Sequence, residues 1–283
     1  MRELSLFKFC PKFKPNQLKI CLLLLFLFGG ERAFSQIALN VSPPILEVEV
    51  TGGGVRNFQI ELINGGEEEI TVTVDLADFL LSPEGNTELQ GKGETSFSLS
   101  EWMTTKQDKQ IVLKPGEKRK VGFELRVPRG ERGARYGVVV FEALPREIPR
   151  GKIALGIRTG SLVFLTIPRT EKIGGEIKEI SIEESKVTFQ NTGNTHLEVE
   201  GSLLVKNPEG KVINRLHFPE NPSLVLPQGE RYFSIPWDKE SLLPGKYLLE
   251  VRMSARRGRQ LINLDRREIE YEVLKGGEKQ IGG

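Results

Sequence analysis

The feature that most constrains the fold is a two-residue alternation of apolar and polar side chains. It recurs in short runs bounded by Gly, Pro or Asn, as in residues 58–62 (FQIEL), 70–74 (ITVTV) and 121–127 (VGFELRV). Alternation of this kind gives a strand one face for a core and one for water. No window of about a dozen residues keeps a helical stripe of apolar residues free of Gly and Pro. The chain is therefore predicted to be all-β, with many short antiparallel strands that form sandwiches.

An internal repeat divides the chain into two halves. Three short turn and strand motifs, called repeat marks below, occur twice in the same order. They are Asn64-Gly65-Gly66 and Asn191-Thr192-Gly193, residues 113–117 (LKPGE) and 226–230 (LPQGE), and residues 133–140 (GARYGVVV) and 245–251 (GKYLLEV). Units this long are whole domains, unlike the shorter units of solenoids. The repeat predicts that Tyr136 and Tyr247 are equivalent. They match the tyrosine corner of immunoglobulin-like domains, with ordinary strand packing as the alternative.

The predicted organisation is two tandem immunoglobulin-like antiparallel β-sandwich domains after a signal peptide. The expected boundaries are a signal peptide at 1–35, a first sandwich at 37–169, a hinge at 170–175, a second sandwich at 176–274 and a flexible tail at 275–283. The tail is expected to be flexible because its sequence, KGGEKQIGG, has little apolar content.

The N-terminus has the pattern of an export signal. Four lysines precede an apolar run at 20–28, and Ala33 and Ser35 supply the small residues that signal peptidase requires. We expect cleavage between Ser35 and Gln36, with an uncleaved N-terminal anchor as the alternative. Both cysteines, Cys10 and Cys21, lie before this point, so the exported chain has no thiol chemistry. The predicted location is the periplasm or cell surface, and no later run is long enough to span a membrane.

Charge and motifs argue against nucleic-acid binding and catalysis. Loss of residues 1–35 would remove six basic and two acidic residues and leave a net charge near −2. The two histidines, His196 and His217, have no metal-ligand or catalytic companion in sequence, and the phosphate-binding and hydrolase motifs are absent. The prediction is a non-enzymatic protein without a cofactor or metal. Carboxylates in residues 67–69, in 183–184 and at Asp75 with Asp78 leave a carbohydrate hydrolase as the least favoured alternative.

Several of these residues also resemble a known family. Residues 42–47 (SPPILE), the strand ending at Asn64, the Trp102 segment, residues 113–117, Val127-Pro128 and residues 136–142 (YGVVVFE) occur in an order that resembles PapD-like pilus chaperones. They resemble still more the first domain of WxL-type cell-wall proteins. The resemblance covers residues 37–169 and implies an exported β-sandwich that binds peptidoglycan, a surface protein or a subunit strand. The chaperones hold a subunit's C-terminal carboxylate with two basic residues, whose counterparts no motif identifies here.

The leading functional hypothesis is therefore a chaperone-like binding or assembly module. Its expected partner is an exported protein or an anionic envelope polymer such as peptidoglycan, and the alternative role is a structural part of a surface appendage. Contact is expected along an exposed strand edge or an interdomain groove, near Lys152, Arg158 and Arg169. These charges could instead only protect an edge from aggregation. Trp102 is expected to pack in the core, with sugar stacking as its alternative.

Overall fold

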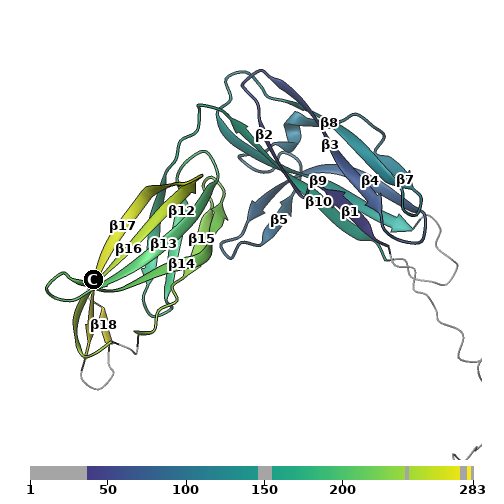
Figure 1. Cartoon of the computed structure of the whole chain (residues 1–283). Coiled ribbons are helices and arrows are strands. Elements are labelled where there is room, and N and C mark those ends of the chain that lie inside the picture. Colours follow the sequence, from purple (N-terminus) through teal and green to yellow (C-terminus); the bar gives the residue numbers. More distant parts are fainter. Residues whose placement is uncertain (1–36, 146–154, 240–241, 275–278, 282–283) are drawn as a thin grey trace, which may run out of the picture. The chain divides into compact units, whose positions relative to one another are not determined.

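The computed structural model describes residues 37–145, 155–239, 242–274 and 279–281. The predicted signal peptide at 1–35 and Lys152 lie outside the described residues. The described chain forms two immunoglobulin-like β-sandwiches, so the predicted fold class is confirmed (Figure 1). No described helix is long and apolar enough to cross a membrane.

The first sandwich packs a four-stranded sheet against a six-stranded one. The four-stranded sheet has the order β1 (Leu39–Ser42), β3 (Val55–Asn64), β8 (Lys118–Arg126) and β6 (Met103–Thr105), with the short 3-10 helix η1 (Ser100–Trp102) before β6. The six-stranded sheet has the order β2 (Ile45–Glu49), β10 (Ile157–Ile167), β9 (Gly133–Pro145), β4 (Ile70–Leu81) and β5 (Thr87–Gln90), and β7 (Gln110–Leu113) also pairs with β4.

The second sandwich has the same plan with fewer strands. One sheet has the order β11 (Gly175–Ser181), β12 (Lys186–Asn191) and β15 (Glu230–Ser234). The other has the order β14 (Val212–Val225), β13 (Leu197–Lys206), β16 (Gly245–Arg257), β17 (Gln260–Val273) and β18 (Lys279–Ile281). By their order in the sheets, β9 and β10 of the first sandwich correspond to β16 and β17 of the second.

Each sandwich buries the apolar face of its alternating strands in its own core. Phe123 and Phe141 are completely buried in the first core, and Phe189 and Val251 in the second. Trp102 packs partly buried against the first core, as expected, and the Arg135 guanidinium lies 5.2 Å from its ring centre. Core packing thus explains Trp102 without a sugar.

The Asn-x-Gly marks form the same buried hydrogen-bond hub in both sandwiches. The Nδ2 of Asn64 donates to the carbonyls of Glu68 (2.8 Å) and Leu113 (3.1 Å), and its Oδ1 accepts the Gly66 N–H (3.0 Å). The Asn191 side chain makes the matching three bonds, to the carbonyls of Thr195 (2.8 Å) and Val225 (3.0 Å) and from the Gly193 N–H (2.9 Å). Both asparagines are completely buried, so each satisfies main-chain groups that water cannot reach.

These hubs also correct the predicted alignment of the second repeat mark by one residue. The carbonyl of Asn64 accepts the Gly116 N–H, and that of Asn191 accepts the Gln228 N–H. Gly116 and Gln228 both have positive φ, at 71° and 60°. Gly116 therefore corresponds to Gln228 and not to Gly229, because the turn is defined by its backbone conformation and tolerates a non-glycine residue at some strain.

The prediction that Tyr136 and Tyr247 are equivalent residues is wrong, although they do lie on corresponding strands. Gly133 and Gly245 each pair with the last residue of the following strand, Ile167 and Val273. Tyr136 lies three residues after its glycine and Tyr247 two residues after its own, so the side chains lie on opposite faces of their sheets. The Tyr247 hydroxyl donates to the Leu243 carbonyl (2.8 Å), as in a tyrosine corner. The Tyr136 hydroxyl instead accepts the His196 main-chain N–H (2.7 Å).

Hydrogen bonds and strand pairing occur at described residues of the predicted hinge and tail. In the hinge, the Thr170 hydroxyl donates to the Ile167 carbonyl (2.7 Å) and accepts the Gly133 N–H (2.7 Å). Within the predicted tail, β18 pairs with Tyr271–Val273 of β17.

Candidate partner-binding edge

One strand edge of the first sandwich is only partly paired. The chain enters the sandwich as β1, which pairs antiparallel with β3, and then crosses to the other sheet as β2, which runs parallel to β10. The pairing of β2 covers only Leu162–Thr166 of β10. Among the described residues, no strand pairs with the outer side of Ile157–Ser161, which we call the open edge.

The main-chain groups of the open edge can be oriented from the bonds beside it. The Leu162 N–H donates to the Pro44 carbonyl (2.9 Å), and the Thr166 carbonyl accepts the Val50 N–H (3.1 Å). Successive residues of a strand present their main-chain groups to opposite sides, so the even-numbered residues of β10 face outward. The N–H and C=O groups of Arg158 and Gly160 therefore point away from β9. They form a template for an added strand.

The core side of this edge carries both polar and apolar side chains: Thr159 and Ser161 are polar, and the Ser161 hydroxyl donates to the Pro43 carbonyl (2.7 Å). Val163 and Leu165 belong to the buried core, and the same face of β10 continues through Ile157 to Leu155. Ile157 is half-buried, whereas Leu155, just before the strand, is 78% exposed. The start of the open edge thus combines unpaired main chain with the apolar side chains of Leu155 and Ile157, which a partner strand can use for hydrogen bonding and burial.

The predicted basic residues do not form one cluster. Arg158 lies exposed within the open edge, across the strand pair from Glu142 of β9. Arg169 lies exposed in the turn after β10, with a positive φ of 67°. At about 3.3 Å per strand residue, the two Cα atoms are roughly 35 Å apart. The structure places only Arg158 at the open edge. Sequence analysis expected contact through an exposed strand edge near Arg158, but it did not identify where along β10 the pairing with β2 ends.

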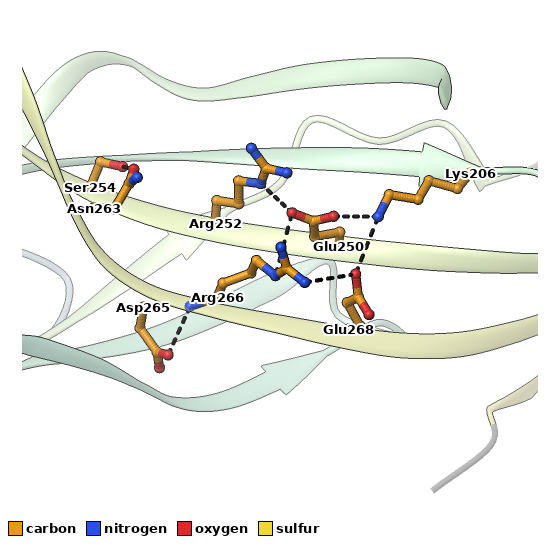
Figure 2. A network of polar contacts seen from close by, with 8 residues as sticks. All are labelled: Lys206, Glu250, Arg252, Ser254, Asn263, Asp265, Arg266 and Glu268. Atoms are coloured by element: carbon orange, nitrogen blue, oxygen red, sulfur yellow. Dashed lines mark hydrogen bonds and ion pairs between the residues drawn. The ribbon is translucent and has the colours of Figure 1, made fainter. Parts of the chain in front are cut away.

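The carboxylate of Glu250 is surrounded by cations on the outer face of the second sandwich (Figure 2). It is completely buried and contacts Lys206 and Arg252, with Arg266 Nε at 3.7 Å. Lys206 also bonds Glu268 at 3.2 Å. Burial alone would raise the pKa of Glu250, but the hydrogen bonds and charges of Arg252 and Lys206 outweigh it and lower the pKa to about 2. A carboxylate with a pKa this low does not exchange a proton near neutral pH, as a general acid or base must.

Other polar groups that the sequence singles out have structural partners. Both carboxylate oxygens of Asp78 accept main-chain N–H groups, from Gly93 (3.0 Å) and Ser100 (3.2 Å). His196 is half-buried, and burial lowers the pKa of its imidazole. Where the structure describes the chain, no group of three or more His, Cys, Asp or Glu side chains could hold a metal.

Comparison with solved structures shows which known folds this architecture resembles. The structure of a class 5 fimbriae chaperone, CfaA, aligns with this chain over 98% of the chaperone and 82% of this chain. The TM-score is 0.50 and the sequence identity is 10%. The chain has a PapD-like fold. The SafB chaperone, solved with the Salmonella enterica SafA pilin, gives a TM-score of 0.46 at 10% identity over 83% of this chain and 97% of its own. No family model and no curated protein matches the sequence.

At 10% identity the likeness concerns the fold alone. The predicted resemblance to PapD-like proteins is confirmed at that level, and the resemblance to WxL-type proteins stays a prediction. In this PapD-like fold the open edge belongs to the last strand of the first sandwich, where β2 reaches only part of its neighbour.

Proposed function

We propose that the chain is an exported, non-enzymatic chaperone-like module that holds an extended segment of another exported protein. The segment adds as a strand to the open edge of β10. The observation that carries this proposal is the end of β2 pairing at Leu162, which leaves the outward main-chain groups of Arg158 and Gly160 without a strand partner among the described residues.

A protein fits this edge better than a polymer. Outward N–H and C=O groups on alternate residues match the main chain of a polypeptide, and apolar side chains at Leu155 and Ile157 bury apolar side chains of the added strand. The solved structure with a TM-score of 0.50 is described as a fimbriae chaperone, which agrees with a role in holding other polypeptides. The proposed site of action is outside the cytoplasm, in the periplasm or at the cell surface.

Basic residues have a secondary part in the proposal. Arg158 would contact an acidic group of the partner at the open edge, where partial desolvation strengthens a charged hydrogen bond. Lys152 and Arg169 complete the proposed set, with Arg169 at the far end of β10 and in position for a more distant part of the partner. Most of the binding energy is assigned to main-chain pairing and apolar burial, since exposed ion pairs contribute little.

Two substitutions at one position separate main-chain pairing from charge. Arg158→Pro removes an outward N–H while leaving the bonds to β9 in place, because proline is tolerated where a strand N–H faces solvent. Arg158→Ala removes the charge and keeps the N–H. With a synthetic peptide of about seven residues and alternating valines as the probe, Arg158→Pro should abolish binding and Arg158→Ala should weaken it only slightly.

The opposite ranking would contradict strand addition, as would equal binding by the two variants. Circular dichroism and thermal unfolding of both variants establish that they remain folded. Export has its own test: N-terminal sequencing of the exported protein should begin at Gln36, and an intact Met1 would contradict cleavage.

A further inference from the structure

A turn of the second sandwich is held against the first sandwich around a histidine side chain. The turn between β12 and β13 places the ring of His196 beside Tyr136 of β9 and Phe164 of β10, with ring centres 5.8 and 5.4 Å apart. We call this contact, residues 194–196 against β9 and β10, the joint. We propose that protonation of His196 opens the joint, so that the contact between the two sandwiches responds to pH. The proposal does not depend on strand addition at the open edge.

Hydrogen bonds to the main chain hold the turn in place. The Asn194 carbonyl accepts the Ala134 N–H (2.8 Å), and the His196 N–H donates to the Tyr136 hydroxyl (2.7 Å). The Asn194 side chain also donates to the Thr170 carbonyl (3.1 Å). Because Ala134 is completely buried, its amide can exchange with water only when the joint opens.

The hydrogen bonds of the joint suit a neutral imidazole. Nδ1 of His196 lies 3.2 Å from the Tyr136 hydroxyl oxygen, so a neutral ring can accept the hydroxyl proton there. Burial raises the pKa of Tyr136, which therefore keeps this proton. A protonated ring becomes a donor at Nδ1, and the hydroxyl proton must then turn to the Thr195 side chain, the other side-chain partner of the hydroxyl.

The surroundings of the ring also disfavour a positive charge. The ring is half-buried beside two aromatic side chains. The charged groups that act on it are Glu47 of β2 and Glu198 of β13, and both favour the protonated form. Burial outweighs them and lowers the pKa of the His196 imidazole from its ordinary value of 6.5. A proton therefore binds more tightly when the joint is open and the ring is in water.

This difference makes the proton a ligand of the open joint. Above pH 6.5 the ring is neutral in both states, and the closed joint has its full stability. As the pH falls below 6.5, the open state takes up a proton that the closed state does not. The equilibrium then moves toward opening by up to about tenfold per pH unit, until the pH reaches the lowered pKa of the closed joint. Histidine is the side chain suited to such a response in mild acid.

Amide hydrogen exchange at Ala134 measures opening of the joint in the natural protein. Its protection factor, corrected for the intrinsic pH dependence of exchange, should fall by about three- to tenfold between pH 7.5 and 5.5. The amides of Val74 and Asn191 are controls that should keep their protection, because they donate to the Lys109 and Gly229 carbonyls within one sandwich (2.8 and 3.0 Å). Unchanged protection at Ala134 overturns the proposal, as does an equal fall at all three amides.

Two matched variants assign the response to one histidine. His196→Phe keeps an aromatic ring against Tyr136 and Phe164 but cannot take up a proton, so the protection of Ala134 should no longer depend on pH. His217→Phe is the control, since His217 is exposed on β14 and its replacement should leave the response unchanged. The same pH response in His196→Phe as in the natural protein overturns the proposal.

The titration of the His196 ring itself, followed by NMR in the natural protein, decides the case in which His196→Phe disturbs the joint already at pH 7.5. A midpoint below 6.5 is expected. A midpoint at or above 6.5 overturns the proposal, because the closed joint would then bind the proton at least as tightly as the open one.

Discussion

The two sandwiches use the same sheet in opposite ways. Counted from Gly133 and Gly245, Val138 of β9 occupies the position of Glu250 of β16. Val138 is buried in an apolar cluster with Tyr136 and Phe79, whereas Glu250 is buried beneath lysine and arginine side chains. The outer face of this sheet is thus apolar in the first sandwich and ionic in the second. Equivalent backbones do not imply equivalent surfaces, since the outward residues are free to differ.

The edges of the two sheets differ in the same way. Residues 265–268 of β17 are four successive charges (DRRE), and Asp265 Oδ2 accepts the Ile177 N–H of β11 at 2.8 Å. Residues 156–160 of β10 (GIRTG) contain one charge. Charged residues on an edge strand commonly prevent the addition of another strand. The β17 edge is therefore protected from strand addition, whereas the β10 edge lacks this protection. The difference agrees with the proposal that a partner strand adds to the first sandwich.

The asparagine hubs should show where the two sandwiches are alike. Each of Asn64→Ala and Asn191→Ala removes three hydrogen bonds and leaves buried main-chain groups unpaired, so each should lower the free energy of unfolding by about 3 kcal/mol. Urea denaturation of the two variants measures this. A large loss in one variant and none in the other would break the structural equivalence of the two hubs.

Glu250 should show where they differ. Glu250→Gln leaves Arg252 and Arg266 facing one another without the carboxylate, and the expected loss at pH 7 is about 2 kcal/mol. Because the folded pKa of about 2 lies below the ordinary 4.5, the stabilisation is complete above about pH 4.5 and disappears as the pH falls through 2.

The difference in unfolding free energy between Glu250→Gln and the natural protein should therefore shrink over that pH range. Glu270→Gln is the matched control, an exposed carboxylate on the same face for which the described residues show no ion pair. A pH-independent loss in Glu250→Gln would contradict the electrostatic explanation.

The two tyrosines should give smaller and unequal effects. Tyr136→Phe leaves the His196 main-chain N–H without its acceptor and should cost about 1.5 kcal/mol. Tyr247→Phe removes an exposed bond to the Leu243 carbonyl and should cost about 0.5 kcal/mol. Thermal unfolding orders the two variants. Equal losses would favour the equivalence that the structure contradicts.

The sequence was sufficient for the fold because alternation and turn residues act locally. The Asn-x-Gly marks predict equivalent turns correctly, since their hydrogen bonds are made mostly by the turn itself. The tyrosine error was avoidable: Tyr136 lies three positions after Gly133 and Tyr247 lies two positions after Gly245, so the side chains must lie on opposite faces. An exposed strand edge near Arg158 was expected, but its extent was not predictable, because it depends on how far β2 follows a strand more than 100 residues later in the chain.

The most direct test of the account is amide hydrogen exchange at β10, measured by NMR with and without the strand peptide. In the free protein, the amides of Ile157 and Thr159 should be protected by their bonds to β9, and those of Arg158 and Gly160 should exchange rapidly. Addition of the peptide should slow exchange at Arg158 and Gly160 and leave Ile157 and Thr159 nearly unchanged. Unchanged rapid exchange at Arg158 and Gly160 under saturating peptide would contradict strand addition at this edge.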